Sequence, residues 1–392
     1  MKLFKLSAAL TLAGALLAPL YASATATIAH RGVYHDISNY SNLPENSYYA
    51  VTRAKDMGFA GVELDLRLAS DGTVMVTHDK IANRSTRDDG GNGWYNPIDG
   101  MNSQAPGAIW INTKNSGHWK NTLLKVYAKD GVLDREQVHD WDQAFYMQSL
   151  DSMLQMLSDH RRDVLHNNNF KIILDIQDPD VFHLAADVVK YFGVQDTVYL
   201  KFFVSNGLYK NLRYDGADTC YVYAKENNLT GLKLIPQIND GEMDQDEDDN
   251  ANISAFQTRL TIGAYLDCWA NASRQHGDAP TVPIVSASVP LNKPWAKDGA
   301  REAINWARSH GRQTMSIVPN PDAGRISSGL CVAYTFQSTN VKAALFRDDV
   351  RAAKQTFVDE VRPDYVISDV MGDIAHNHGS ADFSFFHGNL CR

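Results

Sequence analysis

The chain has 392 residues, and 44% of them are hydrophobic, which is enough to bury the core of one barrel-sized domain. Its 46 acidic and 37 basic residues give a formal net charge of −9 at pH 7. This balance argues against nucleic acid or an anionic membrane surface as a partner held by bulk charge. A small anion in a locally positive pocket is not excluded.

The first 24 residues have the pattern of a secretory signal peptide. Lys2 and Lys5 precede an apolar run that ends near Leu20, and small residues at 22–24 suit a cleavage site. The run is too short for a membrane-spanning helix, and no later segment reaches the required length. We therefore expect an exported protein, periplasmic or secreted, with a single mature domain over residues 25–392. Loss of both lysines would bring its formal charge to −11.

The mature chain begins with a short apolar strand at residues 27–29, which ends at His30 and Arg31. Residues 44–57 predict a helix that opens at Pro44 and Glu45. A strand end of this kind suits an anionic group. Arg supplies bidentate donors for phosphate, and His carries protons near neutral pH.

The stretch from Gly61 to Asp79 predicts two successive strands separated by a turn at residues 70–72. Glu63 and Asp65 lie two residues apart on the first strand, so both side chains project from the same face. Two acids on one side of an apolar strand repel each other and lose hydration unless something neutralises them. A hard divalent cation such as Mg²⁺ or Ca²⁺ prefers oxygen ligands of this kind.

Five short motifs follow one another in this part of the chain. They are His30-Arg31-Gly32, Pro44-Glu45-Asn46-Ser47, Glu63-Leu64-Asp65, Ser70-Asp71-Gly72 and His78-Asp79. In this order they resemble the glycerophosphodiester phosphodiesterase family, with a dense match from Ile28 to Asp79 and a thinner one afterwards. The resemblance implies an α/β fold, a TIM (β/α)8 barrel of the phospholipase C-like phosphodiesterase type, with an insertion after the third strand.

The resemblance also implies the roles of the residues at the strand ends. His30 and His78 would be the acid–base pair, with the two individual roles left open. Arg31 would clamp the phosphate. Glu45 would lie behind them and hold His30 or a water of the cation, although an acid also suits the start of a helix.

A third cation ligand is expected on the buried strand at residues 171–176, which carries Asp175. In the family this strand usually carries Glu and Lys two residues apart, whereas this chain has Asp175 and Gln177. Related phospholipase D toxins of spider venom also use Asp at this place. Asp175 would complete a set with Glu63 and Asp65 around one divalent cation, Mg²⁺ or Ca²⁺. Gln177 can donate a hydrogen bond to phosphate but cannot offset charge in the transition state.

Lys201 is the candidate to replace the missing lysine. It alternates with apolar residues on the strand predicted at residues 198–203. Two orientations remain open: Lys201 faces the barrel interior and meets the phosphate, or it caps an exposed strand edge.

Residues 83–147, rich in Gly and Asn and with scattered aromatic residues, form the expected insertion. In the family an insertion at this point covers the barrel mouth and shapes the choice of substrate. The alternative is an excursion whose aromatic residues, such as Trp119, pack locally. Residues 375–392 are expected to form a C-terminal tail.

The later chain alternates strands with helices, as in a mostly parallel sheet. Further strands are predicted at 219–223, 232–238, 283–287, 313–318 and 365–368, and helices at 150–157, 181–192, 299–309 and 341–361. With the earlier ones this makes ten candidate strands for an eight-stranded barrel. We expect residues 219–223 and 283–287 to be the two surplus candidates, or to be strands outside the barrel.

All four cysteines lie in the mature chain, and an even number in an exported protein suggests two disulfides. Three pairings are open, and nearness in sequence favours Cys220–Cys268 and Cys331–Cys391.

Together these features predict an exported, metal-dependent hydrolase that cleaves glycerophosphodiesters to glycerol 3-phosphate and an alcohol by catalysis with two histidines. Two alternatives remain open: a phospholipase D-like enzyme acting on lysophospholipid or sphingomyelin, and a catalytically weak homologue that binds a phosphodiester. The expected partner is a small-molecule phosphodiester or lysophospholipid. No nucleic acid, transmembrane segment or protein partner is inferred.

Overall fold

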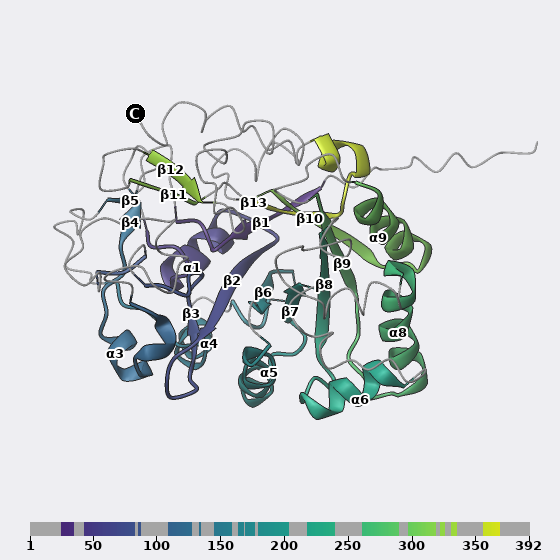
Figure 1. Ribbon diagram of the computed structural model, residues 1–392, viewed down its shortest axis with the longest axis horizontal. Coiled ribbons are helices and arrows are strands. Elements are labelled where there is room, and N and C mark those ends of the chain that lie inside the picture. Colours follow the sequence, from purple (N-terminus) through teal and green to yellow (C-terminus); the bar gives the residue numbers. More distant parts are fainter. Residues whose placement is uncertain are drawn as a thin grey trace, which may run out of the picture.

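Eight parallel strands close into a barrel with helices on its outside (Figure 1). The computed structural model describes residues 25–34, 43–82, 85–87, 109–127, 133–134, 145–158, 164–167, 169–176, 179–203, 218–239, 261–289, 297–318, 322–325, 331–334 and 356–368. Around the barrel the strands are β1 (Ala26–His30), β2 (Gly61–Leu68), β6 (Lys171–Ile176), β7 (Val198–Phe203), β8 (Lys233–Asn239), β9 (Ile284–Ser288), β10 (Gln313–Val318) and β13 (Tyr365–Ser368). Because β1 pairs with β2 on one side and with β13 on the other, the ring is closed. The predicted TIM barrel is confirmed.

The two surplus strand candidates differ from the prediction. Residues 219–223 lie in helix α6 (Thr219–Glu226), whose buried residues Cys220, Tyr223 and Ala224 have the three- and four-residue spacing of a helix face. The segment at 283–287 is barrel strand β9, so its assignment as surplus was wrong. Among the ten predicted strands, the other one that lies outside the barrel is β3 (Val74–Val76), which follows a tight turn and pairs antiparallel with β2.

The main helices connect the strands and cover the outer face of the barrel (Figure 1). They are α1 (Tyr48–Asp56), α4 (Leu150–Leu157), α5 (Val181–Phe192), α6, α8 (Ile262–Gln275) and α9 (Asp298–Ser309). Residues 356–361 are helical, and the rest of the helix predicted over 341–361 lies outside the described residues. Within the described ranges, none of the helices combines the length and the apolar character that crossing a bilayer requires.

Helix α1 begins later than predicted. Ser47 is its N-cap, and the Ser47 side chain accepts a hydrogen bond from the backbone N–H of Ala50. Pro44 and Glu45 therefore belong to the loop before the helix, where a side chain can reach the barrel end.

The described part of the expected insertion packs against the β2–β3 hairpin. It contains η1 (Ile111–Thr113), α3 (Ser116–Lys120), β4 (Val126–Tyr127) and β5 (Leu133–Asp134). Trp119 is fully buried in a small cluster with Ala69 and Met75, and its indole N–H donates to the carbonyl of Ile111 at 2.8 Å. Trp119 thus packs locally. Another two-stranded sheet joins β11 (Asp322–Arg325) to β12 (Cys331–Tyr334).

The barrel interior changes from apolar to polar along the strands. A cluster of apolar residues fills the part of the interior toward the N-terminal ends of the strands: Ile28, Ile173, Tyr199, Ile235, Ile284, Met315, Tyr365 and Ile367. Two residues further along several strands, toward their C-terminal ends, stand His30, Glu63, Asp175, Lys201, Gln237 and Ser286, all buried. The C-terminal ends of the strands are where barrel enzymes place their active sites.

A disulfide joins Cys220 of α6 to Cys268 of α8, as predicted. Cys391 lies outside the described residues, so the pairing of Cys331 with Cys391 stays a prediction.

Removal of this disulfide should destabilise the fold. The bond closes a loop with a sequence separation of 48 residues, and a loop of this size corresponds to about 3–4 kcal/mol of lost unfolded-state entropy. We expect urea unfolding of Cys220→Ala/Cys268→Ala to show that loss, and the wild-type protein to lose at least as much after treatment with a reductant. Equal unfolding midpoints for oxidised wild type and variant would contradict this expectation.

Candidate active site

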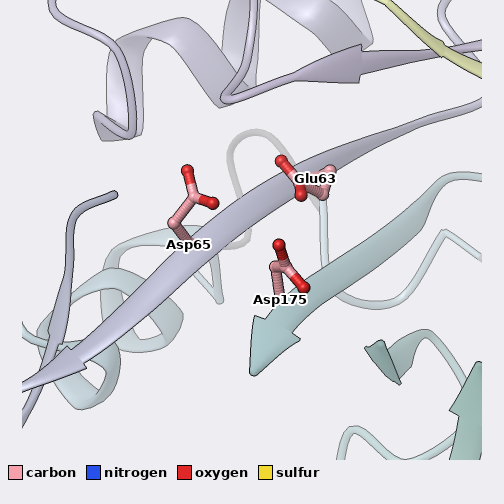
Figure 2. A group of neighbouring side chains, drawn as sticks. All are labelled: Glu63, Asp65 and Asp175. Carbon is pink, nitrogen blue, oxygen red and sulfur yellow. The ribbon is translucent and has the colours of Figure 1, made fainter. Parts of the chain in front are cut away.

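Three carboxylates from two neighbouring strands converge at the C-terminal end of the barrel. Glu63 and Asp65 project from β2 and Asp175 from β6, and Figure 2 shows the three side chains around one space. The parallel register sets Asp65 beside Asp175. One oxygen of each carboxylate lies within 4.8 Å of the others, and the residues are only 0%, 1% and 3% exposed. The spacing of two on β2 and the β2–β6 register thus bring the predicted cation ligands together.

Lys201 lies against two of these carboxylates. Its Nζ donates to Glu63 Oε1 at 2.9 Å and lies 3.2 Å from Asp175 Oδ2. The side chain is fully buried, so Lys201 faces the interior and does not cap an exposed strand edge. Burial by itself lowers the pKa of Lys201, but the charges of Asp175 and Glu63 outweigh it and raise the pKa above its ordinary value. The ammonium therefore remains charged.

Arg31 and Glu45 form the opposite side of the cluster. Arg31 Nε lies 3.2 Å from Asp65 Oδ2, and Arg31 Nη1 lies 3.4 Å from Glu45 Oε1. The loop before α1 thus brings Glu45 to the guanidinium, and both residues are almost completely buried. Arg31 supplies a positive charge next to the carboxylates, as a phosphate-binding residue would.

Asn46 is a site residue that the sequence analysis did not single out. Its side-chain N–H donates to Asp65 Oδ2 at 3.0 Å, and its Oδ1 accepts from the backbone N–H of Asp65 at 3.0 Å. Its own N–H donates to the carbonyl of Arg31 at 2.9 Å. Asn46 and Arg31 both have left-handed backbone, with φ of 55° and 56°. Asn tolerates left-handed backbone better than most residues do. An Asn in the loop before a predicted helix was therefore the feature of the sequence that could have indicated this turn.

The first histidine, His30, ends β1 opposite Glu63 in the strand register. His30 Nε2 lies 3.8 Å from Glu63 Oε2, so the imidazole borders the carboxylate cluster.

The second histidine, His78, follows β3. The backbone N–H of Thr77 donates to the carbonyl of Asp65 at 2.9 Å, and Arg67 Nε donates to the carbonyl of His78 at 2.8 Å. These bonds hold the segment that carries His78 against β2.

Asp79 is the second site residue that the sequence analysis left without a role. Its Oδ1 lies 2.6 Å from Nδ1 of His78, and both side chains are buried. A carboxylate on Nδ1 fixes the ring and leaves Nε2 as the nitrogen that exchanges a proton. The sequence feature that could have indicated this role is the position of Asp79, an acid directly after a candidate catalytic histidine.

The residues fit a divalent cation. Glu63 Oε2 is buried and has no hydrogen-bond partner within the described part of the chain. The cluster holds four carboxylates and two permanent cations, a formal charge of −2. These acids are Glu45, Glu63, Asp65 and Asp175, and the cations are Arg31 and Lys201. Carboxylate oxygens are the donors that Mg²⁺ and Ca²⁺ prefer. Gln177 lies outside the described residues.

Comparison with known proteins identifies relatives of this part of the chain. Residues 30–208 match the model of the "Glycerophosphoryl diester phosphodiesterase family". A "Glycerophosphodiester phosphodiesterase" of Caldanaerobacter subterraneus subsp. tengcongensis is 41% identical over 66 residues, which is 17% of this chain and 25% of the relative. "Glycerophosphodiester phosphodiesterase 1" of Bos taurus is 44% identical over 59 residues, or 15% and 16% of the two chains. The alignments thus span a quarter or less of these curated relatives.

Among solved structures, a glycerophosphoryl diester phosphodiesterase from Parabacteroides distasonis is similar with a TM-score of 0.47 and 14% identity. That alignment covers 89% of this chain and 84% of the other.

Replacing Asn46 should loosen Asp65. Asn46→Ala removes both hydrogen bonds to Asp65 and leaves a left-handed backbone without a side chain that favours it, so we expect about 2–4 kcal/mol of destabilisation. Asn46→Gly removes the same bonds but suits the backbone, and should be about 1 kcal/mol less harmful. Urea unfolding measures both. Wild-type stability in Asn46→Ala would show that the two bonds contribute nothing.

Proposed function

Since residues 30–208 belong to the glycerophosphoryl diester phosphodiesterase family, we propose that the protein hydrolyses glycerophosphodiesters. The products would be glycerol 3-phosphate and an alcohol. The observation that carries this proposal is the buried trio of Glu63, Asp65 and Asp175 at the C-terminal end of the barrel. Three buried carboxylates of this kind can bind a divalent cation, and a bound cation attracts an anionic phosphodiester.

Glu63, Asp65 and Asp175 would hold one divalent cation, Mg²⁺ or Ca²⁺. When bound, it would supply Lewis-acid stabilisation to a phosphate oxygen. The chain fixes all three ligands: Asn46 and Arg31 contact Asp65, and Lys201 contacts both Glu63 and Asp175. Ligands held in this way lose little freedom when the cation binds.

His30 and His78 would handle the protons. His30 borders the cluster through Glu63, and Asp79 holds His78 through Nδ1, so that proton exchange would pass through Nε2. One imidazole would activate the nucleophile and the other would protonate the leaving alcohol. Two such groups support hydrolysis better than binding alone.

Arg31 and Lys201 would counter the charge of the phosphate. Both are buried cations beside the carboxylate trio, and positive groups fixed in a dry site act strongly on charge that develops in a transition state. Gln177 would add a hydrogen bond as the residue two positions after Asp175.

We also propose that the protein is exported. The charged, apolar and small-residue pattern of residues 1–24 supports this, and so does the disulfide between Cys220 and Cys268. Expression of the full chain in a bacterium, followed by fractionation and mass measurement, tests it. A shortened chain outside the cytoplasm is expected, whereas a full-length chain retained in the cytoplasm would refute export.

The proposed activity should follow both the cation and the histidines. With glycerophosphocholine, release of glycerol 3-phosphate should stop in EDTA and resume with Mg²⁺ or Ca²⁺. His30→Ala and His78→Ala should each lower kcat by about 10²–10⁴-fold, as expected for lost acid–base catalysis. His183→Ala, on the exposed face of α5, is the matched control and should behave as wild type.

Three results would contradict this proposal in different ways. Release that persists in EDTA would exclude the cation role. Choline release from lysophosphatidylcholine or sphingomyelin alone would indicate the phospholipase D-like alternative. Cation-dependent binding of glycerophosphocholine by folded protein, with no product, would indicate a binding homologue.

Asp79 should act through His78. Asp79→Asn removes the carboxylate from Nδ1, so kcat should fall on the order of 10²-fold. In a His78→Ala background the same substitution should have little further effect, because the group it orients is gone. Glu226→Gln removes an exposed carboxylate from α6, away from the site, and serves as the control. Additive losses in the double variant would contradict the coupling.

A further inference from the structure

We propose that Lys201 is a built-in counterion of the cation site, which holds the carboxylate trio together without a cation and weakens its affinity for one. The proposal rests on the cation site of the proposed function but not on turnover. It assigns Lys201 a positioning role toward Glu63 and Asp175, in addition to any contact with phosphate.

The strand register brings the lysine to the carboxylates. Lys201 on β7 is the direct neighbour of Asp175 on β6, and Asp175 is the neighbour of Asp65 on β2. From β7 the side chain reaches past β6 to Glu63, where its Nζ donates at 2.9 Å, while it remains 3.2 Å from Asp175 Oδ2. One ammonium therefore joins a carboxylate of β2 to a carboxylate of β6.

Burial makes this contact strong. Lys201, Glu63 and Asp175 are 0%, 0% and 3% exposed, so water screens the charges only weakly. Two buried carboxylates side by side repel each other, and removing the Lys201 ammonium between them would leave uncompensated negative charge in the barrel. Lys201 supplies the positive charge that lets this arrangement fold.

Every carboxylate of the trio contacts at least one positive group. Asp65 contacts Arg31 and Asn46, and the other two carboxylates share Lys201. A divalent cation that binds the trio must enter beside the ammonium. Lys201 should thus reduce the affinity of the trio for the divalent cation. When no divalent cation is bound, Lys201 keeps the three ligands assembled.

The position of this lysine in the sequence differs from the one that the family resemblance implies. The family resemblance leads one to expect a lysine two residues after the third ligand, where this chain has Gln177. The ammonium comes from the next strand instead, at the register position beside Asp175. A lysine on the neighbouring strand approaches the carboxylates sideways, and this approach produces the contact with Glu63.

Lys201→Met in the full chain tests the proposal with two readouts that do not require activity. The first is the melting temperature in EDTA and in saturating Mg²⁺ or Ca²⁺, and the second is the Kd of the cation by titration calorimetry. In EDTA we expect Lys201→Met to melt well below wild type, and the cation to restore most of the difference. The Kd should become about tenfold tighter, because a positive charge has left the site.

A charge-balanced variant guards against simple misfolding. Asp175→Asn/Lys201→Met removes one charge of each sign, so its melting temperature in EDTA should return toward wild type, with a smaller shift on adding the cation. Lys233→Met is the matched control. Lys233 lies on β8 with Nζ 3.7 Å from Asp196, outside the cluster, and its removal should change the melting temperature equally with and without the cation.

Two results would overturn the counterion role. The first is a Lys201→Met protein with wild-type melting in EDTA and an unchanged Kd. The second is a loss of stability that is equal with and without the cation and is not relieved by Asp175→Asn. A failure of the proposed function is distinguishable: wild type would then bind the cation and respond to Lys201→Met as expected, but release nothing from glycerophosphocholine.

Discussion

The burial of three like charges in one small space is the constraint on which the rest of the site depends. Glu63, Asp65 and Asp175 lie where the barrel interior turns from apolar to polar, and little water reaches them. The chain can bury carboxylates in such a place only if positive charge and hydrogen-bond donors surround them. Lys201 on one side and Arg31 on the other meet this need. Lys201 lies on barrel strand β7, and Arg31 lies in the loop that directly follows β1.

The backbone near Arg31 shows a second constraint. Arg31 and Asn46 both adopt left-handed conformations, which side chains other than glycine rarely take, and a backbone hydrogen bond joins them. In return, the Arg31 guanidinium and the Asn46 amide both reach Asp65. Gly32 continues the turn with a φ of 83°, and a Cβ there would lie 2.7 Å from Cβ of Ala50. The loop after β1 is thus shaped by the packing of α1 as much as by the site.

Much of the fold and the site could be predicted from the sequence because the signals are local. The spacing of Glu63 and Asp65 on a strand of alternating apolar residues fixes their common face, and alternation of strands with helices indicates the parallel barrel. The misses have a different origin. Residues 219–223 combine β-branched and aromatic residues yet form a helix, because their buried face follows helical spacing against α8. Asn46 acts through Asp65, a partner 19 residues away that only the folded chain brings near. Asp79 is next to His78 in sequence, but only the folded backbone shows that its carboxylate meets the imidazole. The orientation of Lys201 depends on the register between β6 and β7.

Closure of the barrel has a consequence for the order in which the site can form. β1, which carries His30, is bordered by β2 from the early chain and by β13, the last described strand. The same seam joins Thr25 and Ala26 to the carbonyls of Pro363 and Asp364 by hydrogen bonds of 2.8 Å each. The first three hundred residues contain every carboxylate of the cluster and both candidate catalytic histidines, but without β13 the ring that holds them is open. Assembly of the site therefore waits for the last strand to emerge, and proteolysis just before Tyr365 would leave both β1 and β10 with an unpaired edge.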